Sequence, residues 1–168
     1  AGWLRTQALS AFVSGRLDEA KSLYQQVLRG EPNNSAALRG VGLTAARLGA
    51  LEALETGCTA IIDHHESPNA IDGSLTVIAD ACNEVGVRIN TCYGITDRHG
   101  AAGAAAGLAE NDRYLTELAP IPPESAMRLG MVGVHAAFTC TDDHLAAAAQ
   151  MASKHGVGVH IHVAEKTA

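Results

Sequence analysis

The sequence has few aromatic residues, few charges and no long apolar run. Aromatic residues make up 4% of its 168 residues, too few for a surface that stacks nucleic-acid bases. The net charge of −6 lacks the basic excess that phosphate-rich partners require, so we expect neither a nucleic acid nor an anionic membrane as a partner. No window of about 20 consecutive apolar residues occurs, and we expect no transmembrane helix.

Signals of export and of a cysteine framework are also missing. Residues 1–5 show none of the charged, apolar and small-residue regions of a signal peptide, so we expect a cytoplasmic protein. The cysteines are widely spaced and form no C-x-x-C pair, which argues against a zinc knuckle and against a disulfide framework. We expect all of them to be small buried thiols. They are Cys58, Cys82, Cys92 and Cys140.

Residues 1–49 have a helical pattern. Apolar residues recur at helical spacing after an acidic first turn, and the sequence Pro-Asn-Asn at 32–34 ends that helix. We expect about three helices. The stretch GRLDEA at 15–20, followed by Leu23-Tyr24 and Pro32, resembles the tetratricopeptide pattern of about 34 residues. Only about one and a half repeats are present, and an ordinary helical hairpin is the alternative.

From residue 50 onwards, strands and helices alternate. This alternation predicts parallel strands joined by right-handed crossovers, and therefore an α/β fold for residues 50–168. The strands are apolar almost throughout and end in polar residues, as in α/β enzymes whose chemistry lies at the carboxyl ends of the strands. The expected strands are 59–65, 87–93, 130–138 and 157–163, and the expected helices are 73–85, 104–118 and 142–155.

Histidine is concentrated in this second part, since all eight histidines lie at or after His64. His160 and His162 alternate with Ile161 along the last expected strand, so both should point to one face. Neutral imidazoles aimed at one point suit a metal ion, and Glu165 could exchange protons with a water that the metal activates. The alternative is that both histidines are hydrogen-bonded core residues, because a bare H-x-H is a weak signal.

Six segments occur in order along residues 51–168. Together they resemble the amidohydrolase superfamily, within its cytosine-deaminase and chlorohydrolase branch, and most of all the SsnA-type aminohydrolases. The resemblance implies roughly the second to fifth strands of a (β/α)8 barrel, a fold that typically needs about 250 residues. The segments are 54–68 (LETGCTAIIDHHESP), 86–88 with 92–93, 96–100 (TDRHG), 109–113 (AENDR), 131–139 (MVGVHAAFT) and 158–165 (GVHIHVAE).

The resemblance also implies roles for individual residues. His162 corresponds to a metal ligand on the fifth strand, and Glu165 to the carboxylate that acts as general acid and base. His135 would face the substrate, together with His160. His64 and His65 would line the same pocket, with a structural role for these two equally open. The implied cofactor is a divalent metal, zinc or iron, and the implied reaction is hydrolysis of a C–N or C–Cl bond in a small cyclic or guanidine-like substrate.

The departures from the family pattern limit this prediction. The family's first-strand H-x-H, sixth-strand His and eighth-strand Asp have no counterpart here. One ligand of four cannot hold zinc or iron tightly, so we expect an inactive fragment with weak or no metal binding. The exposed edges of a partial barrel could pair with a second copy.

Two alternatives to an enzyme fragment stay open. The first is an interaction protein whose N-terminal helices bind a peptide. The second is a chimeric or misassembled chain without a selected function, which the abrupt change in pattern near residue 50 would explain.

Overall fold

The computed structural model describes residues 2–122 and 126–165. The chain divides into two compact units, Ala1–Thr59 and Ala60–Ala168. Within the described ranges, no helix is both long enough and apolar enough to cross a membrane.

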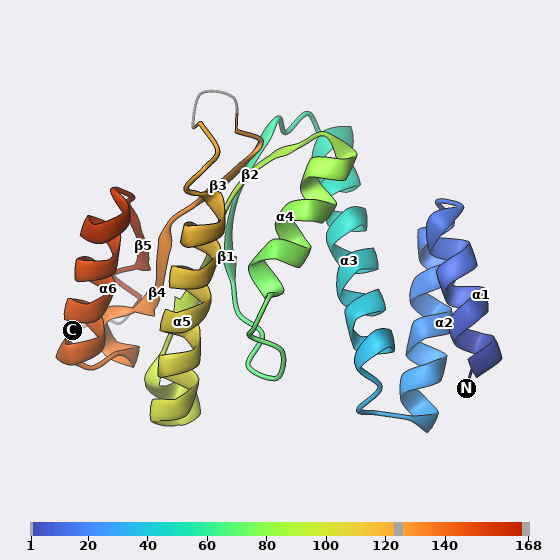
Figure 1. Cartoon of the computed structure of the whole chain (residues 1–168), viewed down its shortest axis with the longest axis horizontal. Helices are drawn as coiled ribbons and strands as arrows, with labels where there is room; N and C mark the ends of the chain where they lie inside the picture. Colours follow the sequence, from blue (N-terminus) through green and yellow to red (C-terminus); the bar gives the residue numbers. More distant parts are fainter. Residues whose placement is uncertain (1, 123–125, 166–168) are drawn as a thin grey trace. The chain divides into compact units, whose positions relative to one another are not determined.

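The first unit consists of the helices α1 (Gly2–Val13), α2 (Leu17–Gly30) and α3 (Ser35–Glu55), each packed against the next (Figure 1). The prediction of about three helices is confirmed. Small residues let the helices approach closely, since a Cβ at Gly40 would lie 2.5 Å from the ring of Tyr24. The side chain of Asn34 caps α3 by accepting a hydrogen bond from the backbone N–H of Ala37 at 3.0 Å. The predicted junction near residue 50 falls inside α3 and stays a prediction.

The second unit alternates strands and helices, as predicted. All of its strand pairs are parallel, and the strand order is β1-β2-β4-β5, with β3 beside β2. The predicted α/β fold with a parallel sheet is therefore confirmed. The elements are β1 (Ala60–His65), α4 (Ser74–Val85), β2 (Arg88–Ile95), the 3-10 turn η1 (Asp97–His99), α5 (Gly100–Leu118), β3 (Arg128–Gly130), β4 (Val132–Ala136), the 3-10 turn η3 (Ala137–Thr139), α6 (Asp142–His155) and β5 (Val159–His162).

The strand predicted at 130–138 differs from the observed structure. It is divided into β3 and β4, which pair with successive parts of β2, and it ends at Ala136, where the chain enters η3. The buried side chain of Asn111 on α5 fills the gap in this ladder. Its amide donates to the backbone oxygen of Tyr93 at 2.8 Å, and its oxygen accepts from the backbone N–H of Tyr93 at 3.0 Å and of Gly133 at 3.3 Å.

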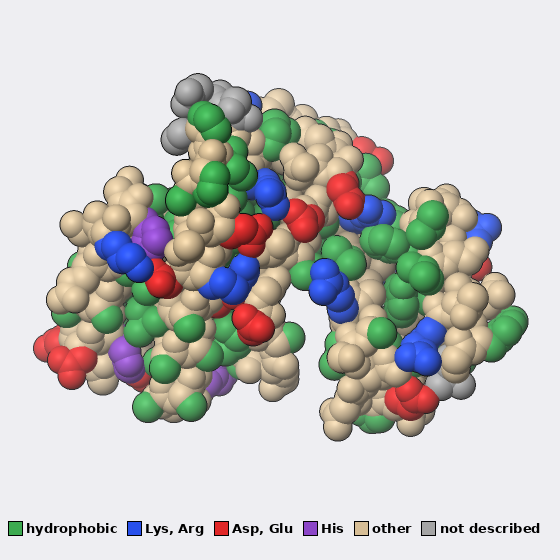
Figure 2. Space-filling model, viewed as in Figure 1, with side chains coloured by type: hydrophobic (Ala, Val, Ile, Leu, Met, Phe, Trp, Pro, Cys, Tyr) green, Lys and Arg blue, Asp and Glu red, His purple; other side chains and the backbone are tan. Residues whose placement is uncertain are grey.

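Helices α4, α5 and α6 pack on one face of this sheet (Figure 1). Apolar side chains from β2, β4, α5 and α6 form the core between them, and Ile161 of β5 packs against it. In the face shown in Figure 2, charges of both signs are interspersed over α4 and α5. Arg113 and Glu117 of α5 form an ion pair at 2.9 Å, and Arg128 of β3 pairs with Asp80 of α4 at 2.6 Å.

The cysteines are all free thiols, but they differ in burial. Cys82 and Cys92 are buried, Cys140 is partly buried and Cys58 is exposed. The prediction of a buried thiol is therefore wrong for Cys58, which follows the end of α3 and precedes β1.

Candidate functional site

Strand alternation places a set of histidines on the sheet face opposite the helices. Val134 belongs to the core on the helix side, and Ile161 packs against that core. Their neighbours along β5 and β4 must therefore point to the other face. These neighbours are His160 and His162 on β5 and His135 on β4, and His64 on β1 joins them there.

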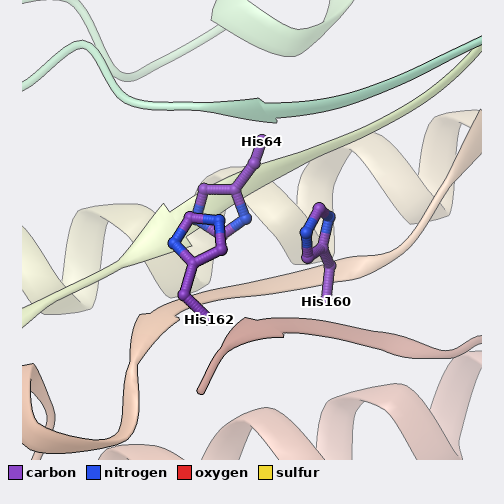
Figure 3. Close-up of side chains that lie close together, drawn as sticks. All are labelled: His64, His160 and His162. Atoms are coloured by element: carbon purple, nitrogen blue, oxygen red, sulfur yellow. The ribbon is translucent and has the colours of Figure 1, made fainter. Parts of the chain in front are cut away.

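The sheet is curved so strongly that side chains of its two outer strands touch. The ring centroid of His64 lies 4.4 Å from that of His162 and 4.8 Å from that of His160. The two β5 rings are 5.5 Å apart. Figure 3 shows the imidazole of His64 extending from β1 toward the two imidazoles of β5. The structure thus unites residues that are nearly 100 positions apart in the sequence.

The three imidazoles offer a ligand set for a divalent metal. One ring nitrogen from each of His64, His160 and His162 lies within 4.8 Å of the others. His64 Nε2 and His160 Nδ1 are buried and have no hydrogen-bond partner among the described residues. Buried polar atoms normally have a partner. Imidazole nitrogens are preferred ligands of zinc and neighbouring transition metals, so the donor type fits the metal that the sequence predicts.

The surroundings of His64 keep its imidazole neutral. Burial and, to a lesser extent, the charges that His162, His160 and His135 would carry lower its pKa to about 4, against an opposite effect of Glu66. His64 Nδ1 lies 3.8 Å from the Cys92 sulfur, which leaves Nε2 for another partner. A neutral imidazole is the form that binds metals.

Gly94 on β2 makes room for this ring. A Cβ at this position would lie 2.5 Å from His64 Nε2, so any larger residue would displace the imidazole. The glycine therefore has a steric role beside the candidate ligand atom.

His135 lies next to the three imidazoles without joining them. Its ring centroid is 5.6 Å from that of His162 and 6.4 Å from that of His64. Its Nδ1 forms a hydrogen bond of 3.1 Å with Thr139 Oγ1, which fixes the orientation of the ring.

The structure does not bring His65 into this group. As the neighbour of His64 on β1, it points to the helix side, where its ring lies 6.0 Å from that of Tyr93 and its Nε2 is 2.9 Å from Ser67 Oγ. Burial lowers the pKa of His65. Its contacts connect β1 to the loop that follows.

Glu165 lies just beyond β5 and is exposed. The preceding residue, Ala164, has φ of 60°, a left-handed conformation that is uncommon for residues other than glycine and turns the chain before the carboxylate. Glu165 is not a member of the three-residue ligand group. The predicted convergence of its carboxylate with His162 stays a prediction.

A charged cluster at the ends of β1 and β2 has no counterpart in the sequence prediction. Glu66 forms an ion pair with Arg98 at 2.7 Å and with His99 at 2.9 Å. Burial alone would raise the pKa of Glu66, but the hydrogen bond with His99 and the charge of Arg98 outweigh it and lower the pKa. The sequence contains one signal that could have predicted this cluster, namely charges of opposite sign after two adjacent strands.

Comparison with known proteins agrees with this fold. The model of the amidohydrolase family matches residues 43–168, about three quarters of the chain. The 5-methylthioadenosine/S-adenosylhomocysteine deaminase of Symbiobacterium thermophilum is 33% identical over 119 residues, which cover 70% of this chain and 25% of that protein. The 5'-deoxyadenosine deaminase of Methanopyrus kandleri is 31% identical over 127 residues, which cover 71% of this chain and 26% of that protein.

The fold is also found in a solved structure. A crystal structure of a triazine hydrolase variant superimposes with a TM-score of 0.59 and 18% identity, over 74% of this chain and 30% of that chain. The chain spans about a quarter of the length of the curated relatives that it matches. Its parallel strands are those of a partial barrel, and the chain belongs to the amidohydrolase family.

Proposed function

We propose that the second unit is the catalytic portion of a metal-dependent hydrolase that removes an amino group from a small cyclic substrate. The observation that supports this most is the histidine group on the open face of a parallel, barrel-like sheet in an amidohydrolase chain. The named relatives are deaminases of adenosine derivatives, so we propose a substrate of that kind, with a C–Cl bond as the alternative target. Within the family, we propose the SsnA-type branch, which the six segments along residues 51–168 together resemble most.

Each candidate residue has a distinct role in this proposal. His162 would hold a divalent zinc or iron ion, which lowers the pKa of water and so supplies a nucleophile at neutral pH. Glu165 would act as general base and then as general acid, and would deliver a proton to the leaving amine. His135, oriented by Thr139, would donate a hydrogen bond to the charge that develops on the substrate.

The remaining histidines divide between the two faces of the sheet. His160 lies on the open face with its ring centroid 5.5 Å from that of His162, and it would contact a substrate bound there. His65 lies against Tyr93 on the helix side, and we therefore place it outside the substrate pocket in a structural role.

A grafting experiment tests this proposal. Residues 43–168 would replace the matching segment of the Symbiobacterium thermophilum deaminase, and release of ammonia from 5-methylthioadenosine would be measured. We expect metal-dependent turnover that Glu165→Gln lowers by about 100-fold or more, since general acid–base catalysis contributes roughly that much. The exposed substitution Asp143→Asn is the control and should have no effect. A folded, metal-loaded graft without turnover would contradict the proposal.

A groove on the helical unit favours a second function, the binding of a peptide. It has a volume of about 400 Å³, and its lining includes the apolar side chains of Leu9 and Phe12 and the basic side chains of Arg5 and Arg39. This lining suits a peptide with an acidic group and an apolar anchor. We propose this binding role for the tetratricopeptide-like helices.

Selection of phage-displayed peptides on the full chain tests the binding role. We expect acidic peptides that no longer bind after Arg5→Glu and Arg39→Glu together. Arg16→Glu, outside the groove, is the control and should leave binding intact. Selection of peptides without acidic residues would argue against the groove.

A further inference from the structure

We propose that His64, His160 and His162 together bind one divalent cation of the zinc class in this chain. The proposed hydrolytic function uses only His162 of these three as a metal ligand, so the site goes beyond it. The sequence predicts weak or no metal binding, because it holds a single ligand of the family pattern, His162. Alternation along β5 adds His160, the curvature of the sheet adds His64, and together they change that expectation.

The geometry requires only side-chain adjustment. Zinc–nitrogen bonds of about 2.0–2.1 Å at tetrahedral angles separate two ligand nitrogens by about 3.4 Å. The three candidate nitrogens lie within 4.8 Å of one another. Rotation about the side-chain bonds of three partly exposed histidines can close this difference without a shift of the strands.

The unsatisfied state of two of the nitrogens points to a ligand. His64 Nε2 and His160 Nδ1 are buried and lack any hydrogen-bond partner among the described residues. The ring of His64 packs against Gly94, where a Cβ would lie only 2.5 Å from Nε2. A cation between the rings would satisfy both nitrogens.

The ligand set selects the kind of cation. Three imidazoles without a carboxylate suit zinc, cobalt, nickel or copper, whereas calcium and magnesium prefer oxygen ligands. Three protein ligands leave a fourth tetrahedral position for water or another small ligand. We assign zinc as the cation and use cobalt as its spectroscopic probe.

A cation in this position would connect the outer strands of the sheet. His64 is on β1 and the other two ligands are on β5, with β2 and β4 between them. The metal would act as a cross-link over the open face and hold the sheet in its curved form.

Titration of the metal-free full chain with ZnCl₂, followed by calorimetry, tests the assignment. We expect one zinc ion per chain, and CoCl₂ should give the visible absorption of a tetrahedral nitrogen-rich site. Each of His64→Gln, His160→Gln and His162→Gln should weaken zinc binding by about 100-fold or more, because a three-ligand site loses one ligand. His99→Gln, which removes an exposed imidazole outside the group, should leave the affinity unchanged. Circular dichroism confirms that each variant is folded, and Gly94→Ala gives a second test that removes no ligand.

Other outcomes would overturn the assignment. Binding that depends on His162 but not on His64 or His160 would refute the three-imidazole site and leave the proposed hydrolase intact. Absence of zinc binding, or equal loss in His99→Gln, would also refute it. If the full chain binds zinc as expected but the graft is inactive, the proposed hydrolase function is refuted and the assignment of the metal site stands.

Discussion

At the scale of single residues, Gly94 shows how a side chain that is absent shapes the site. The ring of His64 occupies the space that any other residue at 94 would need. The ring centroid of His64 lies 4.8 Å from that of His160, while Nδ1 lies beside Cys92. The sequence does not predict the contact between Gly94 and His64, because this contact joins neighbouring strands rather than neighbouring positions in the chain.

Gly94→Ala should therefore weaken zinc binding while every ligand is retained. The new methyl group displaces the imidazole of His64, and we expect a loss of about 10-fold in affinity, the size seen when the support of a ligand is disturbed. Gly158→Ala, which has open space around the added Cβ, is the matched control. Equal affinities of the two variants would show that the position of His64 does not matter.

The titration of His64 predicts how the metal-free protein responds to acid. Its pKa is about 4 in the folded chain, below the ordinary value of 6.5. Between these values the unfolded state binds more protons, so the free energy of unfolding should fall as the pH is lowered from 6.5 to 4. Urea denaturation of wild type and His64→Gln at several pH values measures this. Because the substitution removes the titrating group, the variant should lose less stability over this range, and identical pH slopes would contradict the assignment.

At the scale of elements, α5 holds two strands together through polar side chains. Asn111 bonds to the backbone of Tyr93 on β2 and of Gly133 on β4. The adjacent Glu110 accepts hydrogen bonds from the backbone N–H groups of Gly73 and Leu75 at the start of α4. The segment 109–113, which contributed to the family resemblance, thus has a structural function here.

Asn111→Ala should destabilise the α/β unit strongly. The change leaves buried backbone donors without partners, each at a cost of about 1–3 kcal/mol, so we expect a total loss of about 3 kcal/mol or more. Urea denaturation measures the change. Asp112→Asn, which affects ion pairs with Lys154 and His155, should cost no more than about 1 kcal/mol. A loss of similar size in both variants would contradict the bridging role.

The sequence predicts features that follow from a local residue pattern better than contacts between residues far apart in the chain. Alternation along β5 placed His160 and His162 on one face, and helical spacing gave α6 its observed bounds, Asp142–His155. The meeting of His64 with β5 depends on the curvature of the whole sheet, which no local pattern encodes. The split between β3 and β4 depends on Asn111, a residue on another element. The sequence predicts that this helix begins at residue 104, but α5 begins at Gly100. The first residues of α5 are small and offer no capping signal, so the sequence pattern does not indicate the earlier start.

At the scale of the whole chain, the two units should respond differently to zinc. Binding at the proposed site stabilises only the α/β unit, by about 2.7 kcal/mol when free zinc is 100 times the dissociation constant. For a unit of this size that corresponds to a rise in melting temperature of about 10 °C. Differential scanning calorimetry should show this rise for one transition and none for that of the helices. His64→Gln should abolish it, and a shift of both transitions would indicate non-specific binding.

Several whole-chain predictions stay untested. The sheet ends in β1 and β5 within the described residues, and self-association through these edges stays a prediction. The same holds for cytoplasmic location, and for the junction near residue 50 with the chimeric origin that it suggests.

The central claim is that the curved sheet brings three imidazoles of β1 and β5 together around one zinc ion. Anomalous X-ray diffraction at the zinc edge tests this claim most directly. Crystals of the full chain grown with zinc should show one anomalous peak among His64, His160 and His162, with zinc–nitrogen distances of about 2.0–2.1 Å. A peak bound by other residues, or none between β1 and β5, would contradict the account.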